Sequence, residues 1–345
     1  MPNRLLFYLK IAKGESRGKR KTQFFQLSLC RVANIFCTFA TLTQKHSFMN
    51  KHPLKDWLVA GRPWSFPASA MPVAVTLAYL YWAGHEVNWI NGVWALLNII
   101  VFHAAGNTWS DYFDFKHHVD REDTHGVRTL TSGLFRPNEI YRLSLTLLVV
   151  ALVVGIGLLL RTGLPLLYIG IAGAACTLLY PALKYRALGD VVIFIAYALL
   201  PMLGTAYAAT GVVEWNTMWA GVPVGLITVA ILQANNTRDI ETDVRADIST
   251  LAMTLGGRAS MYLYSAEVLF PFGWIAGCAA GGVFPWWTLL VLFSLVPAIG
   301  NVRMMSRYPV LGMESISRLD ELTAKLQLMF SLLFALSFVL ARLFA

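Results

Sequence analysis

Residues 87–114 read VNWINGVWALLNIIVFHAAGNTWSDYFD, an apolar run that ends in two acidic residues. Residues 87–110 contain no Asp, Glu, Lys or Arg, and about 20 such residues suffice for a helix that crosses a bilayer. The rest of the chain is similar, since its 345 residues are 57% hydrophobic and only 14% charged. Soluble domains carry about 25% charged residues, so this composition excludes an ordinary water-soluble enzyme.

Further uncharged stretches predict the other membrane helices. The complete series is 63–85, 87–110, 143–160, 162–183, 191–213, 215–237, 268–302 and 326–341. The stretch 268–302 is too long for one span and contains Gly281, Gly282 and Pro285, which favour a turn. We therefore expect two helices there, the first beginning near Arg258. The sequence predicts an all-α membrane protein with nine transmembrane helices.

Lys and Arg are distributed unevenly over the predicted loops. Seventeen occur from Arg62 onward, and fifteen of these lie before the first helix or in the connections 2–3, 4–5, 6–7 and 8–9. Only Arg161 and Arg342 lie on the other side. Positive residues favour the cytoplasmic face of a membrane. We therefore expect a multi-pass cell (inner) membrane protein whose N-terminus and even-to-odd loops are cytoplasmic.

Nine of the nineteen acidic residues lie in two short segments, which we call the first and second acidic windows. The first follows the second helix and the second follows the sixth, so both are expected on the cytoplasmic face. Their members are Asp111, Asp114, Asp120, Glu122 and Asp123, and Asp239, Glu241, Asp243 and Asp247. Each window begins with Asn-x-x-x-Asp, at Asn107 and at Asn235, 128 residues apart. An internal duplication of a helical unit leaves such a pattern.

The acidic windows predict a site for a divalent cation. Residues four apart share a helix face, so Asp239 and Asp243 lie one above the other, and Asp111 follows Asn107 by one turn. Like charges packed in this way repel one another unless a cation lies between them. Mg²⁺ is commonly bound by a few carboxylates together with substrate phosphates. Basic residues near the windows are candidates for contacting a diphosphate, although each is equally well explained as a cytoplasmic anchor; they are Lys116, Arg128, Lys184 and Arg238.

Four patches of this sequence are similar to those of a known family. They are AGRPWSFP at 60–67, NTWSDYFD at 107–114 with Asp120 six residues further on, YPALKYRALGD at 180–190, and NNTRDIETD at 235–243 followed by TLA at 250–252. Together they resemble the UbiA superfamily of intramembrane prenyltransferases, over about residues 55–345. The spacing of the first aspartate motif is closest to that of the 1,4-dihydroxy-2-naphthoate prenyltransferases of menaquinone synthesis. Ser110 and Asp190 depart from the residues usual in the family, which are Asn and Glu.

The resemblance implies a fold and a reaction. The fold is a UbiA-type bundle of nine helices around a central cavity that is open towards lipid. The reaction moves a polyprenyl group from polyprenyl diphosphate to an aromatic acceptor and requires Mg²⁺. In the naphthoate branch the prenyl group replaces the ring carboxylate, and CO₂ is released.

The same resemblance assigns roles to individual residues. One Mg²⁺ is expected at Asn107, Asp111, Asp114 and Asp120, and a second at Asn235, Asp239 and Asp243. Asp111 and Asp239 are the expected catalytic residues. Tyr180, Tyr112 and Asp190 are candidates for contacting the acceptor or the allylic cation, although core packing explains each tyrosine equally well.

Two other functions fit parts of the pattern. A UbiA-type enzyme with another acceptor, such as 4-hydroxybenzoate or a different quinone precursor, has the same acidic windows. A secondary transporter also contains repeats and intramembrane polar residues, but its charges are expected near the helix centres, whereas here they gather at one face. Glu267 lies inside the seventh helix, where an intramembrane carboxylate suggests a function and where snorkelling or helix pairing explains it equally well.

Most of the net charge of +9 belongs to the start of the chain. Residues 1–48 carry nine basic residues and one acid, a charge of +8, and residues 49–345 carry +1. The charge therefore gives no indication of a nucleic-acid partner for the predicted prenyltransferase domain at 49–345. A transit peptide is one explanation of a basic, acid-poor extension. We prefer the hypothesis that Met49 is the natural start and that residues 1–48 are a disordered tail or a start-site artefact.

Deletion of residues 2–48 should leave membrane insertion and activity unchanged, because the extension contains no predicted span. Fractionation of the truncated chain, together with a Mg²⁺-dependent transfer assay on the membranes, checks this expectation. Loss of either property would show that the extension is required.

Overall fold

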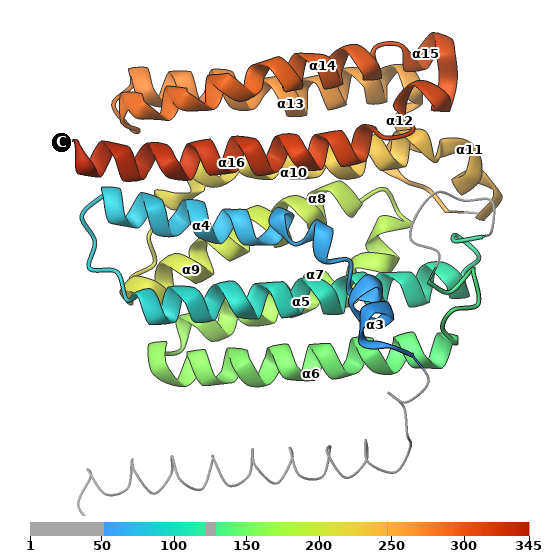
Figure 1. Cartoon of the computed structure of the whole chain (residues 1–345), viewed down its shortest axis with the longest axis horizontal. Coiled ribbons are helices and arrows are strands. Elements are labelled where there is room, and N and C mark those ends of the chain that lie inside the picture. Colours follow the sequence, from blue (N-terminus) through green and yellow to red (C-terminus); the bar gives the residue numbers. More distant parts are fainter. Residues whose placement is uncertain (1–51, 122–128, 247, 345) are drawn as a thin grey trace, which may run out of the picture. The chain divides into compact units, whose positions relative to one another are not determined.

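Helices make up nearly all of the chain that the computed structural model describes, which is residues 52–121, 129–246 and 248–344. Residues Trp57–Ala345 form one compact unit, and the account below is confined to it and to the helix that leads into it (Figure 1). The expected N-terminal extension at 1–48 lies outside the described residues, as does Arg128.

The elements follow one another as helices of very different length. They are α3 (Leu54–Gly61), η1 (Pro63–Ser65), α4 (Pro67–Trp82), α5 (Trp89–Lys116), α6 (Pro137–Thr162), α7 (Pro165–Lys184), α8 (Gly189–Phe194), η2 (Ile195–Leu199), α9 (Leu200–Thr210), α10 (Thr217–Arg238), α11 (Ile240–Asp243), η3 (Val244–Ala246), α12 (Leu251–Leu255), α13 (Gly257–Ala280), η4 (Trp286–Ser294), α14 (Leu295–Met305), α15 (Tyr308–Leu311), η5 (Gly312–Ile316) and α16 (Leu319–Leu343). The long helices lie side by side in a bundle, and the short elements α11, α12 and α15 gather at one end of it (Figure 1).

Every uncharged stretch of the sequence corresponds to helix. Within the described chain, eight helical segments are long and apolar enough to cross a membrane. The predicted first span corresponds to α4, whose 16 residues are fewer than in any of these eight. The division predicted within 268–302 is confirmed, because α13 ends at Ala280 and η4 begins at Trp286.

One span contains a local widening that proline explains. The segment Gly189–Thr210 is a single membrane helix made of α8, η2 and α9. Its middle portion, η2, is a π-helix that ends two residues before Pro201. Proline has no N–H to donate to the preceding turn, and π-helical turns absorb such a break and are frequent at functional sites. Tyr197 of this turn and Pro201 of α9 line the cavity described below.

Aromatic side chains on α16 form the centre of the core. Phe330, Phe334 and Phe338 recur at intervals of four residues and are fully buried. Phe284 packs edge-on against two of them, with ring centroids 5.6 Å apart in each case. The helices α6 and α7 bury much less of their surface and expose large apolar side chains, such as Tyr168 and Ile171. The half of the bundle around α16 is therefore tightly packed, whereas α6 and α7 present an apolar face that suits lipid.

Replacing Gly225 with Ala should destabilise the bundle. A methyl group at this position of α10 would lie 2.6 Å from Ala198 Cβ and 2.7 Å from the Phe194 ring, and such overpacking typically costs about 1–3 kcal/mol. Thermal unfolding in detergent measures the effect. Gly273→Ala on α13 is the matched control, because nothing lies within 4 Å of its added carbon, and it should leave the melting temperature unchanged or raise it. Equal melting temperatures for both variants would contradict the packing described here.

Candidate active site

The sequence patches predicted to act together meet at one end of the bundle. Asp111 and Asp114 of the first acidic window lie in the last two turns of α5, Asp239 and Asp243 of the second follow α10, and residues 185–188 connect α7 to α8. Backbone hydrogen bonds join this connection to the segment that follows the second window, since Ala187 N–H donates to Ser249 O at 2.7 Å and Ser249 N–H donates to Tyr185 O at 3.1 Å. All three patches therefore lie at the end of the bundle where α11 and α12 are labelled (Figure 1).

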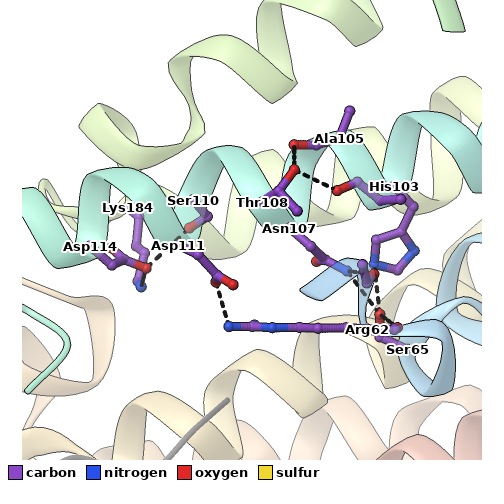
Figure 2. Close-up of polar contacts among 12 residues, drawn as sticks. Arg62, Ser65, His103, Ala105, Asn107, Thr108, Ser110, Asp111, Asp114 and Lys184 are labelled. Atoms are coloured by element: carbon purple, nitrogen blue, oxygen red, sulfur yellow. Dashed lines mark hydrogen bonds and ion pairs between the residues drawn. The ribbon is translucent and has the colours of Figure 1, made fainter. Parts of the chain in front are cut away.

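Asp114 is held by three donors. Lys184 Nζ lies 3.1 Å from one carboxylate oxygen, and Ser110 Oγ donates to the same oxygen at 3.1 Å. The other oxygen accepts a hydrogen bond of 2.7 Å from the Tyr185 hydroxyl. Burial, followed by the charge of Asp114, raises the pKa of Tyr185, so the phenol keeps the proton that it donates. Lys184 and Tyr185, from the segment at 180–190, thus bind Asp114 of the first window, as Figure 2 shows for Lys184.

Asp111 has a partner that we did not predict as a site residue. Its Oδ1 atom accepts from the Arg62 guanidinium, while its Oδ2 atom is buried with no hydrogen-bond partner among the described residues (Figure 2). Burial alone would lower the pKa of Arg62, but Asp111, Asp120 and Asp114 outweigh that effect and raise it. Arg62 therefore carries a positive charge in the centre of the first window. The sequence signal was its place in the segment at 60–67, which we used only to recognise the family.

The amide of Asn107 is held in one orientation. Its Nδ2 atom donates to Gly61 O and to Ser65 Oγ, each at 3.1 Å. Ser65 also contacts His103, whose ring lies between Ser65 and Ser69 at 3.2 and 2.9 Å (Figure 2). Because both nitrogen protons are used in this way, the oxygen of Asn107 is left as the atom that can bind a cation. His103 thus supports Asn107 through Ser65, in addition to packing against its neighbours.

The second window is built around Arg238. Its guanidinium donates to both oxygens of Asp239, at 2.8 and 2.9 Å, and also to Asn235. A further hydrogen bond of 2.8 Å joins it to Asp320 on α16, a residue that the sequence did not single out. Arg238 therefore positions Asn235 and Asp239 while it ties the end of α10 to the start of α16.

Electrostatic interactions show that the two acidic windows face each other. Burial and the charge of Asp114 raise the pKa of Asp120 to about 6, and Asp239 of the second window also raises it. Burial raises the pKa of Asp243 to about 7; Lys184 lowers it, and Asp239, Asp114 and Asp120 raise it. The site thus holds more negative charge than Arg62 and Lys184 neutralise.

A partly open cavity of about 460 Å³ lies beside these residues. Its polar lining includes Asn107, Asp114, Lys184 and Asn235. The remaining wall is mostly apolar and comes from α5, α6, α7 and the span Gly189–Thr210; examples are Phe102, Leu159, Leu166 and Ile193. Along α5 the lining extends from Ala95 to Asp114, which is about 28 Å at 1.5 Å per residue. The cavity therefore suits a ligand with one charged end and a long apolar body.

The other predicted residues lie in different surroundings. Tyr180 lines the cavity, whereas the Tyr112 ring packs against Tyr141 with centroids 4.9 Å apart. Lys116 is exposed, and its ammonium lies over the Phe113 ring. Asp190 is buried, and neither of its carboxylate oxygens has a hydrogen-bond partner within the described parts of the chain.

Replacing Lys184 with Met should lower the stability of the protein, because it leaves the buried Asp114 carboxylate without its closest cation. Breaking a buried ion pair in this way costs about 3 kcal/mol. Thermal unfolding of the purified protein measures the loss. Lys116→Met is the matched control, since it removes an exposed ammonium 5.9 Å from the Phe113 ring and should change the melting temperature little. A Lys184 variant as stable as this control would contradict the assigned pairing.

Comparisons with known proteins agree with this geometry. The model of the UbiA prenyltransferase family matches residues 70–309. "UbiA prenyltransferase domain-containing protein 1" of Xenopus tropicalis is 30% identical over 311 residues, which cover 88% of this chain and 87% of that protein. The apo structure of a UbiA homolog from Aeropyrum pernix has a TM-score of 0.61 at 15% identity, covering 79% of this chain and 97% of the other.

A second solved structure is a UbiA homolog from Archaeoglobus fulgidus bound to GPP and Mg²⁺. Its TM-score is 0.54 at 13% identity, and the match covers 83% of this chain and 99% of that one. These two structural matches show the fold, and the family model covers more than half of the chain. The chain belongs to the UbiA prenyltransferase family and is a prenyltransferase of the membrane.

Proposed function

We propose that this enzyme transfers a polyprenyl group from polyprenyl diphosphate to an aromatic acceptor in a Mg²⁺-dependent reaction. The observation that carries the proposal is the junction of two facing acidic windows with a long apolar cavity. A polyprenyl diphosphate has the same division, with a charged head and an apolar chain. We further propose that the site faces the cytoplasm of a cell (inner) membrane, as the distribution of Lys and Arg favours.

The residues of the two windows fit magnesium. Asp111 presents a buried oxygen with no partner among the described residues, and the fixed amide of Asn107 leaves an oxygen for a cation. In the described part of the chain, no group of three or more His, Cys, Asp or Glu side chains is arranged to hold a metal ion unaided. This agrees with Mg²⁺ ions that take part of their coordination from substrate phosphates. Such ions neutralise the charge of a departing diphosphate.

The proposed ligands divide between the two windows. Asn107, Asp111, Asp114 and Asp120 would hold one ion, and Asn235, Asp239 and Asp243 the other. Lys184 lines the cavity beside Asp114, so its ammonium is placed to bind diphosphate oxygens. Arg62 and Arg238 keep the carboxylates of Asp111 and Asp239 in position. Arg128, the remaining candidate, lies outside the described residues, and the exposed Lys116 has the weakest case of the four cations chosen from the sequence.

The apolar wall suits the chemistry of the allylic group. The bond between the prenyl carbon and the diphosphate oxygen breaks, and the diphosphate leaves with the electron pair. The allylic cation that remains needs protection from water, which the apolar walls of the cavity provide. An aromatic face stabilises such a cation; Tyr180 lines the cavity and is the tyrosine placed for this role, whereas Tyr112 packs against Tyr141.

We propose 1,4-dihydroxy-2-naphthoate as the acceptor, in a step of menaquinone biosynthesis. Support comes from the naphthoate-type spacing of Asn107, Asp111, Asp114 and Asp120. A ring carbon forms the new bond to the prenyl group, and the bond from that carbon to the carboxylate breaks. Its electrons return to the ring as CO₂ leaves. Asp190 is the candidate for contacting the acceptor, since its buried carboxylate has no partner in the described chain.

A panel of acceptors tests this function. Membranes that contain the protein are incubated with geranylgeranyl diphosphate, Mg²⁺ and one of three compounds, namely 1,4-dihydroxy-2-naphthoate, 1,4-naphthalenediol or 4-hydroxybenzoate. The proposal predicts a prenylated product with the first compound, together with one CO₂ for each transfer. A product with only one of the other compounds would overturn the assigned acceptor, and no product with any of them would overturn the proposed transfer.

Replacing Asp111 or Asp239 with Asn should abolish Mg²⁺-dependent transfer, because each change removes a charged ligand from one window. We expect activity to fall by at least about 10²-fold, while membrane insertion is retained. Glu241→Gln is the matched control, since this acid belongs to the second window but is exposed, and it should keep near-normal activity. The assignment fails if either Asn variant matches this control.

A further inference from the structure

A second buried polar region lies in the bundle among α10, α13, α14 and α16. Gln233 and Gln327 are 0% and 1% exposed, and Glu267 is 6% exposed. Neither amide group has a hydrogen-bond partner within the described residues, and the same holds for one carboxylate oxygen of Glu267. Buried polar groups are normally hydrogen-bonded, and leaving one unpaired is destabilising. The region therefore offers unpaired donors and acceptors to a ligand.

The register of the helices brings these three side chains to the same depth. The Tyr264 hydroxyl on α13 lies 2.6 Å from Thr323 Oγ1 on α16, and both helices begin at the end of the bundle that bears the acidic windows. One turn further along each helix are Glu267 and Gln327. On α10, which runs the opposite way, Gln233 precedes Arg238 by five residues, or about 7.5 Å.

The pairing of α10 with α16 completes this register. Arg238 is bonded to Asp320, and Gln327 follows Asp320 by seven residues, or about 10.5 Å. Gln233 and Gln327 therefore lie at similar depths on adjacent helices, and α10 packs against both α13 and α16. A further buried atom without a partner in the described chain extends the region, the hydroxyl of Ser331 one turn beyond Gln327.

The chemistry of the unpaired atoms identifies the occupant. The amides of Gln233 and Gln327 present N–H donors, and the oxygens of Gln233, Gln327 and Glu267 present acceptors. A ligand at this place must therefore both donate and accept hydrogen bonds. Water both donates and accepts, and buried water typically makes 2–4 hydrogen bonds to groups of this kind.

We propose that Gln233, Glu267 and Gln327 enclose a binding site for ordered water within the membrane bundle. Gln233 and Asn235 are two residues apart on α10 and therefore about 200° apart around the helix axis. The water site thus lies on the side of α10 opposite to the cavity that Asn235 lines. Hydrogen bonds through the water fix the rotation of α10.

Thermal unfolding of the full-length protein tests the proposal through the sign of the change. Gln233→Leu and Gln327→Leu keep the side-chain size but remove hydrogen bonds to the water. Each should lower the melting temperature by about 2–4 °C, and the double variant should lower it by less than the sum, because the first change already disrupts the site. If the site is dry, each change removes an unpaired polar group and raises the melting temperature, which would overturn the proposal.

Two additional measurements keep the test decisive. Thr228→Val on α10 is the matched control, since it removes a buried hydroxyl that bonds only to Val224 O of its own helix at 2.9 Å, and it should leave the melting temperature nearly unchanged. Where a Leu variant does not fold, a high-resolution map of the unaltered protein provides the answer. Water density in contact with Gln233, Glu267 and Gln327 supports the site, and direct contacts among these side chains without such density overturn it.

Discussion

Packing several carboxylates into one end of an apolar bundle costs free energy unless positive charge lies between them. In this protein Arg62, Lys184 and Arg238 neutralise part of that charge, and each is bonded to a carboxylate of a different segment. These contacts join α5 to α7 and to Arg62, which follows α3, and they join α10 to α16. The charge that remains raises the pKa values of Asp120 and Asp243, and we propose that divalent cations and a diphosphate complete the site.

The rest of the fold separates this charged end from the membrane interior. Around α16, aromatic residues pack tightly and hold α4, η4 and α16 together. Between α5, α6, α7 and the span Gly189–Thr210, the packing leaves a long apolar cavity instead. The π-helical turn before Pro201 lies against this space. The half of the bundle around α16 is therefore tightly packed, whereas the half formed by α5, α6, α7 and Gly189–Thr210 contains the cavity. The charged residues lie at one end of both halves.

The composition and the uncharged stretches predicted most of the fold, because a bilayer requires long apolar helices. The turn between Gly281 and Pro285 could also be predicted, because the uncharged stretch that contains it is too long for one membrane span. The short length of α4 could not be predicted, because the apolar stretch at 63–85 also contains η1 and the loop after Trp82. Charge counting does not detect where a helix begins inside such a stretch.

The two acidic windows could also be predicted, because their residues recur at helical spacing. The segment at 180–190, which contains Lys184, was identified by its resemblance to the family. Arg62 and Asp320 were missed, since each lies far along the chain from the residue that it contacts, which is Asp111 for Arg62 and Arg238 for Asp320. Lys116 illustrates the converse case. It lies only two residues after Asp114 in the sequence, yet the helix places its ammonium over Phe113 at the exposed surface. Proximity in sequence thus identified the windows but not all of their cations.

Electron paramagnetic resonance of bound Mn²⁺, a substitute for Mg²⁺, measures the central claim most directly. The purified protein is titrated with Mn²⁺ in the presence and absence of an unreactive thio-analogue of a prenyl diphosphate. Two facing windows that share one diphosphate predict two bound ions for each protein when the analogue is present, and much weaker binding without it. Absence of bound Mn²⁺ with the analogue, or binding that does not depend on the analogue, would contradict the account.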